Sequence, residues 1–316
     1  MEYVNRESSE VIKGILICLI VLGHNHILCP NTVSGGMMDF LYQFHVGGFF
    51  VLPFFYQRNI SVSWETICNI IIRCWIPYLW VCILCWLTFS LYQHTFDFGW
   101  RHVMAFFNGT PTPVLHYFGF IFPWFLPTYC SLSILLLLAW NNKWLYYLFI
   151  ILGLGTFLMS WQEFYDLKLI LPFGVGPAIH YFVSGVIAFV VNKHIKYGKY
   201  IGASLFAILS FFWWMNFQIG LLYHLMPTAF FLLLLCVVPY MCFNWLRLLG
   251  KYSLGIYLFH VFVLNIMFRL FPQTVLWGWI ELFLSVSVSL LITIGINKVG
   301  RIRKLLFPHT LMDFKR

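Results

Sequence analysis

Charged residues are scarce in this sequence of 316 residues. Only 9% of them are Asp, Glu, Lys or Arg, whereas 61% are hydrophobic and 21% are aromatic. Soluble globular domains typically have about 25% charged residues, so this composition excludes an ordinary soluble enzyme. Repeated apolar runs of about 20 residues predict instead an all-α, polytopic integral membrane protein.

Long polar segments are also missing. No connection between apolar runs exceeds roughly 25 residues, which predicts one transmembrane domain over residues 1–316 with no fused soluble domain. No small-residue cleavage site follows the first run, so we expect that run to be retained as a helix. The sequence predicts about ten membrane-spanning helices, at residues 11–29, 38–56, 69–91, 116–140, 144–160, 169–191, 200–215, 219–243, 252–271 and 276–297.

Metal-ligand spacings are absent as well. The nine cysteines lie mostly inside apolar runs, without histidines at the spacing of a zinc site, so we expect buried thiols and no metal. The net charge of +9 does not indicate nucleic acid, because its distribution follows topology. With the N-terminus inside, sixteen of the nineteen Lys and Arg residues fall on the inner side. This asymmetry predicts that both termini are cytoplasmic.

Two ionisable residues, Lys13 and His24, stand in the first apolar run. Their separation of eleven residues is three helical turns to within about 20°, so both lie on one face, about 16 Å apart along the axis. Ionisable groups inside a membrane are costly and usually functional. The alternative is that Lys13 extends to the membrane surface and His24 hydrogen-bonds a neighbouring helix. His26 is turned about 200° from His24 and is the weaker candidate.

The second run returns toward the inner side and carries His45 at a depth comparable with that of His24. We therefore predict that these two histidines meet across the first hairpin, where the Gly47–Gly48 pair allows close backbone approach. Arg73 opens the third run on the inner side. With Lys13 it is predicted to form an anion site that combines a point charge with a planar fork. The alternative for Arg73 is an ordinary inner-side anchor.

These residues belong to an ordered series of motifs. Arg6, Glu10, Lys13 and His24 form the pattern R-x3-E-x2-K-x10-H, which resembles the opening of the membrane-bound acyltransferase-3 family. Four later segments are similar to segments of that family: FHVGGFF (44–50), R-x3-PY (73–78), WFL (124–126) and LGKYSLGIYLFH (249–260). The closest branch in appearance is the stand-alone sugar O-acetylases.

The sequence departs from the family pattern at two places. Leu52-Pro53 follows the second-helix phenylalanines, where the family often has Ser-Gly. Asn69 and Ile70 stand where the family often has a second basic residue before the third-helix arginine. The second departure concerns the proposed phosphate site, where Arg58 or Lys13 would have to compensate.

The resemblance implies an O-acyltransferase of the bacterial inner membrane. It is expected to transfer an acyl group, acetyl above all, from acetyl-CoA to a hydroxyl of a cell-surface polysaccharide or of its lipid-linked precursor. The acyl-CoA phosphates would meet Lys13 and Arg73 at the cytoplasmic face. His24 would act as general base for the acceptor hydroxyl or would carry the acyl group transiently, and the sequence leaves both routes open.

The resemblance also assigns expected places to other residues. The pantetheine arm of the donor would follow the first helix past Ile17, Ile20 and Val21. His260 is expected in the inner half of its helix, where the alternative role is a hydrogen bond between helices. We expect His45 to assist His24, Asp39 and Glu163 to orient it, and Trp124, Tyr257 and His260 to line the substrate tunnel.

Two other functions compete with this interpretation. A multi-pass transporter or flippase for a glycan or lipid would need a wide polar cavity and paired broken helices, and the sequence shows no inverted repeat. A non-catalytic subunit of an export complex would retain its function without His24. The expected partners are therefore acyl-CoA, a glycan or lipid-linked saccharide acceptor and membrane lipid, with no nucleic acid.

Overall fold

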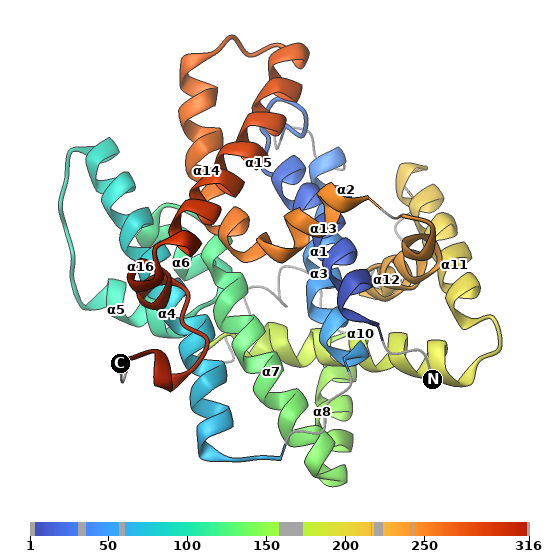
Figure 1. Cartoon of the computed structure of the whole chain (residues 1–316). Helices are drawn as coiled ribbons and strands as arrows, with labels where there is room; N and C mark the ends of the chain where they lie inside the picture. The colour runs from blue at the N-terminus through green and yellow to red at the C-terminus, as the bar shows by residue number, and fades with distance from the viewer. Residues whose placement is uncertain are drawn as a thin grey trace. The chain divides into compact units, whose positions relative to one another are not determined.

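The structure is a computed structural model that describes residues 4–30, 36–56, 61–157, 173–215, 217, 224–241 and 243–314. Within these ranges the regular structure is entirely helical, which confirms the all-α prediction (Figure 1). The chain forms two compact units. The first contains residues 1–57 and 184–298, and the second contains residues 58–183 and 299–316.

Five helical segments in the described part are long and apolar enough to cross a membrane. The predicted number of ten spans and the cytoplasmic position of both termini stay predictions. The five segments are α4 (Trp64–Gln93), Phe122–Asn141, which joins η2 (Phe122–Trp124) to α7 (Phe125–Asn141), α10 (Val175–His194), α14 (Ser253–Leu270) and α15 (Val275–Lys298).

Helix α1 (Arg6–Gly23) begins and ends earlier than the predicted span at 11–29. It begins at Arg6 because the Asn5 side chain accepts a hydrogen bond from the Ser8 amide at 2.7 Å. It ends because the Asn25 side chain accepts from the amides of Ile27 and Leu28, at 3.1 and 2.9 Å. Such local bonds compete with helix propagation. His24 therefore lies at the end of the helix and not inside it.

The predicted second span, 38–56, is broken into three pieces: α2 (Met37–Tyr42), α3 (His45–Val51) and η1 (Leu52–Phe55). The break at residues 43–44 places Tyr42 and His45 at the ends of adjoining helices. Gly48 of α3 faces α1, where a Cβ would lie 2.6 Å from Leu16 Cδ2. An added side chain there would therefore require the end of the Leu16 side chain to move.

Helices α13, α14 and α15 of the first unit pack against α1. Helix α13 (Asn244–Lys251) lies along it, and a Cβ on Gly250 would overlap the Glu10 carbonyl oxygen. Helices α14 and α15 form an antiparallel hairpin (Figure 1), in which the Ser285 hydroxyl donates to the His260 carbonyl at 3.0 Å. The remaining elements are residues 184–194 of α10, α11 (Gly198–Trp214), α12 (Met226–Val237) and η4 (Val238–Tyr240).

The second unit is built on the long helix α4, which contains Pro77. Its other elements are α5 (Trp100–Asn108), α6 (Pro111–Phe118), η2, α7, α8 (Lys143–Thr156), residues 175–183 of α10, α16 (Gly300–Leu306) and η5 (Leu311–Phe314). Residues 299–314, here called the C-terminal segment, dock on α4. The Leu311 amide donates to Asn69 at 2.9 Å, and Arg73 donates to the His309 carbonyl at 3.3 Å.

Candidate active site

His24 lies at the C-terminal end of α1 and is partly exposed. The hydroxyl group of Tyr42, at the end of α2, lies 3.3 Å from its Nδ1 atom and 3.4 Å from its Nε2 atom. Among the described residues, Tyr42 is the one side chain that hydrogen-bonds the His24 ring. A phenol can donate to one imidazole nitrogen or accept from the other, so Tyr42 orients the ring in either tautomer.

Two further histidines surround this pair. The ring centroids of His24 and His260 are 5.2 Å apart, and His260 is fully buried. The Tyr42 ring packs edge-on against His45 at 4.8 Å and against His24 at 5.9 Å. His45 is also fully buried, and its Nε2 atom lies beside Gly23, where a Cβ would be 3.7 Å away. Tyr42 therefore stands between the two histidines predicted to meet.

His260, which was expected to line the substrate tunnel, lies beside His24, with the two ring centroids 5.2 Å apart. Two features account for this proximity. Helix α1 ends at Gly23, six residues before the predicted end, and α14 carries His260 only two turns from its start at Ser253. The periodicity of each separate run contains no information about this pairing. His260 is thus a direct neighbour of the candidate base.

The buried histidines have defined hydrogen bonds on Nδ1. His260 Nδ1 meets the Tyr257 carbonyl at 2.7 Å and the Ile256 carbonyl at 3.2 Å, and His45 Nδ1 meets the Leu41 carbonyl. A carbonyl only accepts, so in the neutral rings Nδ1 carries the proton and Nε2 has the lone pair. The cluster thus presents imidazole nitrogens, without a carboxylate bonded to His24 in the described part of the chain.

The residues predicted to orient His24 lie elsewhere. Asp39 is exposed in the first turn of α2, and its backbone carbonyl accepts from the Gln43 side chain at 3.1 Å. Glu163 lies outside the described residues. Tyr42 supplies the hydrogen bond that was expected from a carboxylate. The sequence pattern did not single out Tyr42, because its position depends on the break between α2 and α3.

The predicted donor-side residues belong to different units. Lys13 is partly exposed on α1, with Nζ 5.9 Å from the centre of the Tyr56 ring. The Tyr56 hydroxyl is bonded to Ser9 Oγ at 2.8 Å, which holds the ring beside the first turns of the helix. Arg73 is exposed on α4 of the second unit. Their joint anion site stays a prediction.

The residues expected along the substrate path are largely buried. Tyr257 is 6% exposed and its ring centroid lies 6.0 Å from that of His260. Trp124, in the second unit, is also 6% exposed. Ile17, Ile20 and Val21 are at most 1% exposed, so neighbouring side chains cover the expected path of the donor arm. The donor arm could pass along this face of α1 only if those side chains moved apart.

A comparison with protein-family models decides the family. The model described as an acyltransferase domain, Acyl_transf_3, matches residues 6–298. The chain belongs to the acyltransferase-3 family. Together with its apolar helices, this membership makes it a membrane acyltransferase. The matched region contains the whole histidine cluster and ends before the C-terminal segment. Comparisons with curated proteins and with solved structures found no match.

In the described ranges no group of three or more His, Cys, Asp or Glu side chains is arranged to hold a metal ion. The His24 cluster consists of three imidazoles and one phenol. Such groups can accept, hold and return a proton, which is the chemistry that acyl transfer to a hydroxyl requires.

Proposed function

We propose that this membrane acyltransferase transfers an acyl group, acetyl above all, from cytoplasmic acyl-CoA to a hydroxyl of a cell-surface polysaccharide or of its lipid-linked precursor. We place it in the bacterial inner membrane as a multi-pass protein with both termini in the cytoplasm. The observation that carries the chemistry is the position of His24. The residue is partly exposed, and its ring is oriented by Tyr42 and flanked by two buried histidines.

His24 acts as general base in this proposal. One ring nitrogen accepts the proton of the acceptor hydroxyl while the hydroxyl oxygen attacks the thioester carbonyl. The carbon–sulfur bond breaks, and the CoA thiolate leaves and takes up the proton that His24 holds. In the second route the His24 nitrogen attacks the thioester itself and an acyl-imidazole forms, which the acceptor hydroxyl then cleaves. Both routes need one unprotonated nitrogen on His24.

Lys13 and Arg73 are proposed to hold the donor phosphates. Lys13 lies eleven residues before His24 on the same helix, about 16 Å along its axis, so a phosphate near Lys13 leaves room for an extended donor arm to reach His24. A transporter or flippase gives no reason for a lysine and an accessible, phenol-bonded histidine at this spacing. The enzyme interpretation accounts for both residues.

The test is transfer of radiolabelled acetyl from acetyl-CoA by the full chain in membrane vesicles that contain the native glycan. His24→Ala should abolish transfer while the protein inserts at the wild-type level. Mass spectrometry of the surface glycan, with and without the active protein, identifies the acyl group and the acceptor together. Near-normal acylation by a well-inserted His24→Ala variant would refute the proposal. Unchanged glycan masses with altered glycan export would favour the transporter.

The two chemical routes can be separated in the same preparation. Incubation with labelled acetyl-CoA in the absence of acceptor should leave label on the protein only if an acyl-imidazole accumulates. Rapid acid quenching and digestion would place the label on the peptide that contains His24. Absence of label on a protein that is active with acceptor would favour general-base catalysis.

A further inference from the structure

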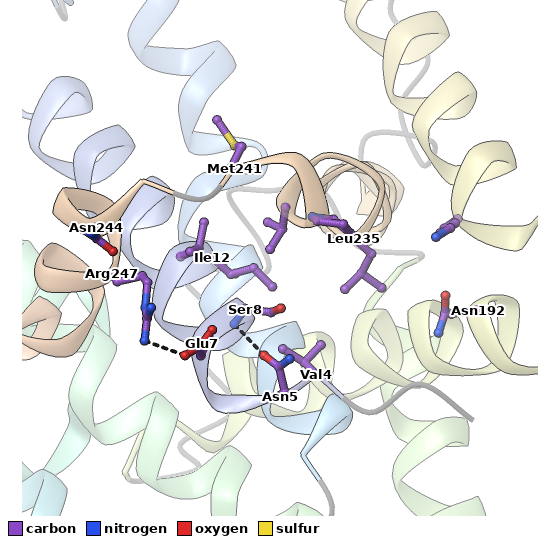
Figure 2. Close-up of a pocket in the computed structure, with 14 residues that line it drawn as sticks. Val4, Asn5, Glu7, Ser8, Ile12, Asn192, Leu235, Met241, Asn244 and Arg247 are labelled. Atoms are coloured by element: carbon purple, nitrogen blue, oxygen red, sulfur yellow. Dashed lines mark hydrogen bonds and ion pairs between the residues drawn. The ribbon is translucent and has the colours of Figure 1, made fainter.

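A pocket of about 560 Å³ lies beside the first turns of α1 in the first unit. Its walls are the starts of α1, α11 and α13, the end of α10, and the end of α12 with η4. Figure 2 shows Asn192 on the opposite side of the pocket from Asn244 and Arg247, with Glu7 and Ser8 of α1 between them. The volume falls in the range of sites that hold a small organic ligand, about 300–1,000 Å³.

The pocket brings together charged, polar and apolar side chains. Lys199 and Arg247 are cations, and Asn192 and Asn244 are amides that form no hydrogen bond with the described residues. Asn5, Glu7 and Ser8 of the start of α1 also line the pocket, and the rest of its wall is apolar. These groups suit a nucleotide. A cation can bind its phosphate, the amides can hydrogen-bond the edge of its base, and the apolar surface can pack against the face of the base. The apolar residues are Val4, Val11, Ile12, Leu235, Val238, Pro239 and Met241.

We propose that this pocket binds the nucleotide end of the acyl-CoA donor, the 3′-phosphorylated adenosine. The proposal rests on the proposed function, because it takes acyl-CoA as the donor. It assigns Lys199 as the principal contact of the ribose 3′-phosphate and Arg247 as a second contact. The adenine lies against the apolar wall, and the amides of Asn192 and Asn244 meet the edge of the base.

The ion pairs in the pocket show which of the two cations is less neutralised by a neighbouring carboxylate. Arg247 Nη2 lies 2.8 Å from Glu7 Oε1, and Arg247 Nε lies 4.0 Å from Glu10 Oε2. Lys199 forms no ion pair with a described residue, and its Nζ lies 5.4 Å from the centre of the Tyr200 ring. Lys199 is therefore the cation whose charge is not already compensated. The guanidinium of Arg247 has five N–H donors, so its contact with Glu7 leaves others available for a phosphate.

The distance to His24 fits the length of the donor. Ile12 lines the pocket, and His24 lies twelve residues later on the same helix, about 18 Å along its axis. A nucleotide in the pocket and a thioester at His24 would thus be separated by about the length of an extended phosphopantetheine arm. Lys13 follows Ile12 on the adjoining helix face, where it would meet the diphosphate that joins the nucleotide to the arm.

The experiment compares two donors that differ only at the proposed contact. The full chain in phosphatidylcholine nanodiscs is titrated with coenzyme A and with dephospho-coenzyme A, which lacks the ribose 3′-phosphate. Wild type should prefer coenzyme A by about tenfold, the size of one charge-assisted contact. Lys199→Ala and Lys199→Gln should bring this ratio close to one and leave the affinity for dephospho-coenzyme A nearly unchanged.

Two further variants sharpen the comparison. Lys196→Ala removes an exposed lysine three residues earlier, whose Nζ lies 5.3 Å from the Tyr197 ring and which does not line the pocket. It should keep the wild-type ratio. Glu7→Gln releases Arg247 from its carboxylate partner, so the preference for coenzyme A should increase. A decrease in that preference would contradict the role of Arg247.

The outcomes separate this inference from the proposed function. Tight coenzyme A binding and active transfer with the same ratio in wild type and in both Lys199 variants would overturn the pocket assignment alone. Absence of binding of either donor, together with absence of transfer from acyl-CoA, would overturn the proposed donor and the pocket assignment together. Loss of the ratio in Lys199→Ala but not in Lys196→Ala supports the assignment.

Discussion

The Tyr42 hydroxyl lies within 3.4 Å of both ring nitrogens of His24. A catalytic histidine is commonly oriented by a carboxylate, which also stabilises the charged imidazolium. Here the orienting group in the described part of the chain is a neutral phenol. A phenol fixes the ring direction without favouring the protonated form, and this suits a base that must begin neutral.

Tyr42→Phe should reduce turnover while donor binding is retained. The change removes one neutral hydrogen bond but keeps the aromatic ring that packs against His45. We expect kcat to decrease about two- to tenfold with little change in the KM for acyl-CoA. The pH at which the rate is half-maximal should also change. Tyr240→Phe is the control, because Tyr240 is 84% exposed. Unchanged kcat and pH profile would remove Tyr42 from the mechanism.

The histidine variants should form a graded series. His24→Ala should lower transfer by at least 10²–10⁴-fold, the range of general-base catalysis. His260→Gln and His45→Gln should have intermediate effects because their rings support His24 and Tyr42. His26→Ala should be mild, since its ring is exposed and packs edge-on toward Phe268 at 6.0 Å. Acetyl transfer is measured with membrane abundance. If His26→Ala were inactive and His24→Ala active, the catalytic histidine would be His26 and not a member of the cluster around His24.

Lys13→Ala should weaken donor use more than it slows the chemical step. The Lys13 ammonium group is proposed as a point charge for phosphate, so its loss should raise the KM for acyl-CoA with a smaller decrease in kcat. Lys13→Arg keeps the charge and should be less harmful. Initial rates over a range of acyl-CoA concentrations test both variants. A decrease in kcat at unchanged KM would show that Lys13 does not hold the donor.

Gly250→Ala should destabilise the first unit. A Cβ at this position would overlap the Glu10 carbonyl, so α13 would have to move away from α1 at a cost of about 1–3 kcal/mol. Gly295→Ala on α15 is the matched control, because nothing lies within 4 Å of its added Cβ. Thermal unfolding in detergent should show a lower Tm for Gly250→Ala only. Equal Tm values would mean that the two helices are free to separate.

The distribution of Lys and Arg residues between the two sides of the membrane predicts that the segment around residues 92–115 faces the outside. Gly99→Cys is a suitable probe, since nothing lies within 4 Å of an added Cβ. Gly109 in the same segment has a φ of 65° and a Cβ there would lie 2.7 Å from Pro127 Cβ, so it is unsuitable. In a background without reactive thiols, Gly99→Cys should react with an impermeant maleimide in intact cells, and Lys196→Cys only after lysis. The reverse pattern would invert the topology.

Sequence alone was sufficient for the helical class, whereas a shared helix face for Lys13 and His24 stays a prediction. Both depend on composition and helical periodicity, which are local properties. The early end of α1 could not be predicted in the same way. It depends on Asn25, which bonds the next turn and also donates to the Gly278 carbonyl at 2.9 Å, 253 residues along the chain. Such a long-range partner has no signature in periodicity.

The composition of the cluster around His24 was only partly predictable. His24, His45 and His260 were recognisable as ionisable groups in apolar runs. Tyr42 was not, because a tyrosine in such a run has many ordinary roles and this one depends on the break between α2 and α3. The pocket beside α1 combines residues from six separate elements, so no single sequence motif predicts it.

The C-terminal segment has a consequence for the order in which the protein is completed during synthesis. Arg73 has one hydrogen bond in the described part of the chain, and its partner, His309, is added 236 residues later. At synthesis rates of about 5–20 residues per second, Arg73 waits roughly 10–50 s for that carbonyl. A product that stopped at Lys298 would contain the whole matched family region and yet never acquire this bond. Residues of the C-terminal segment thus supply the hydrogen-bond partner of a residue that is synthesised much earlier.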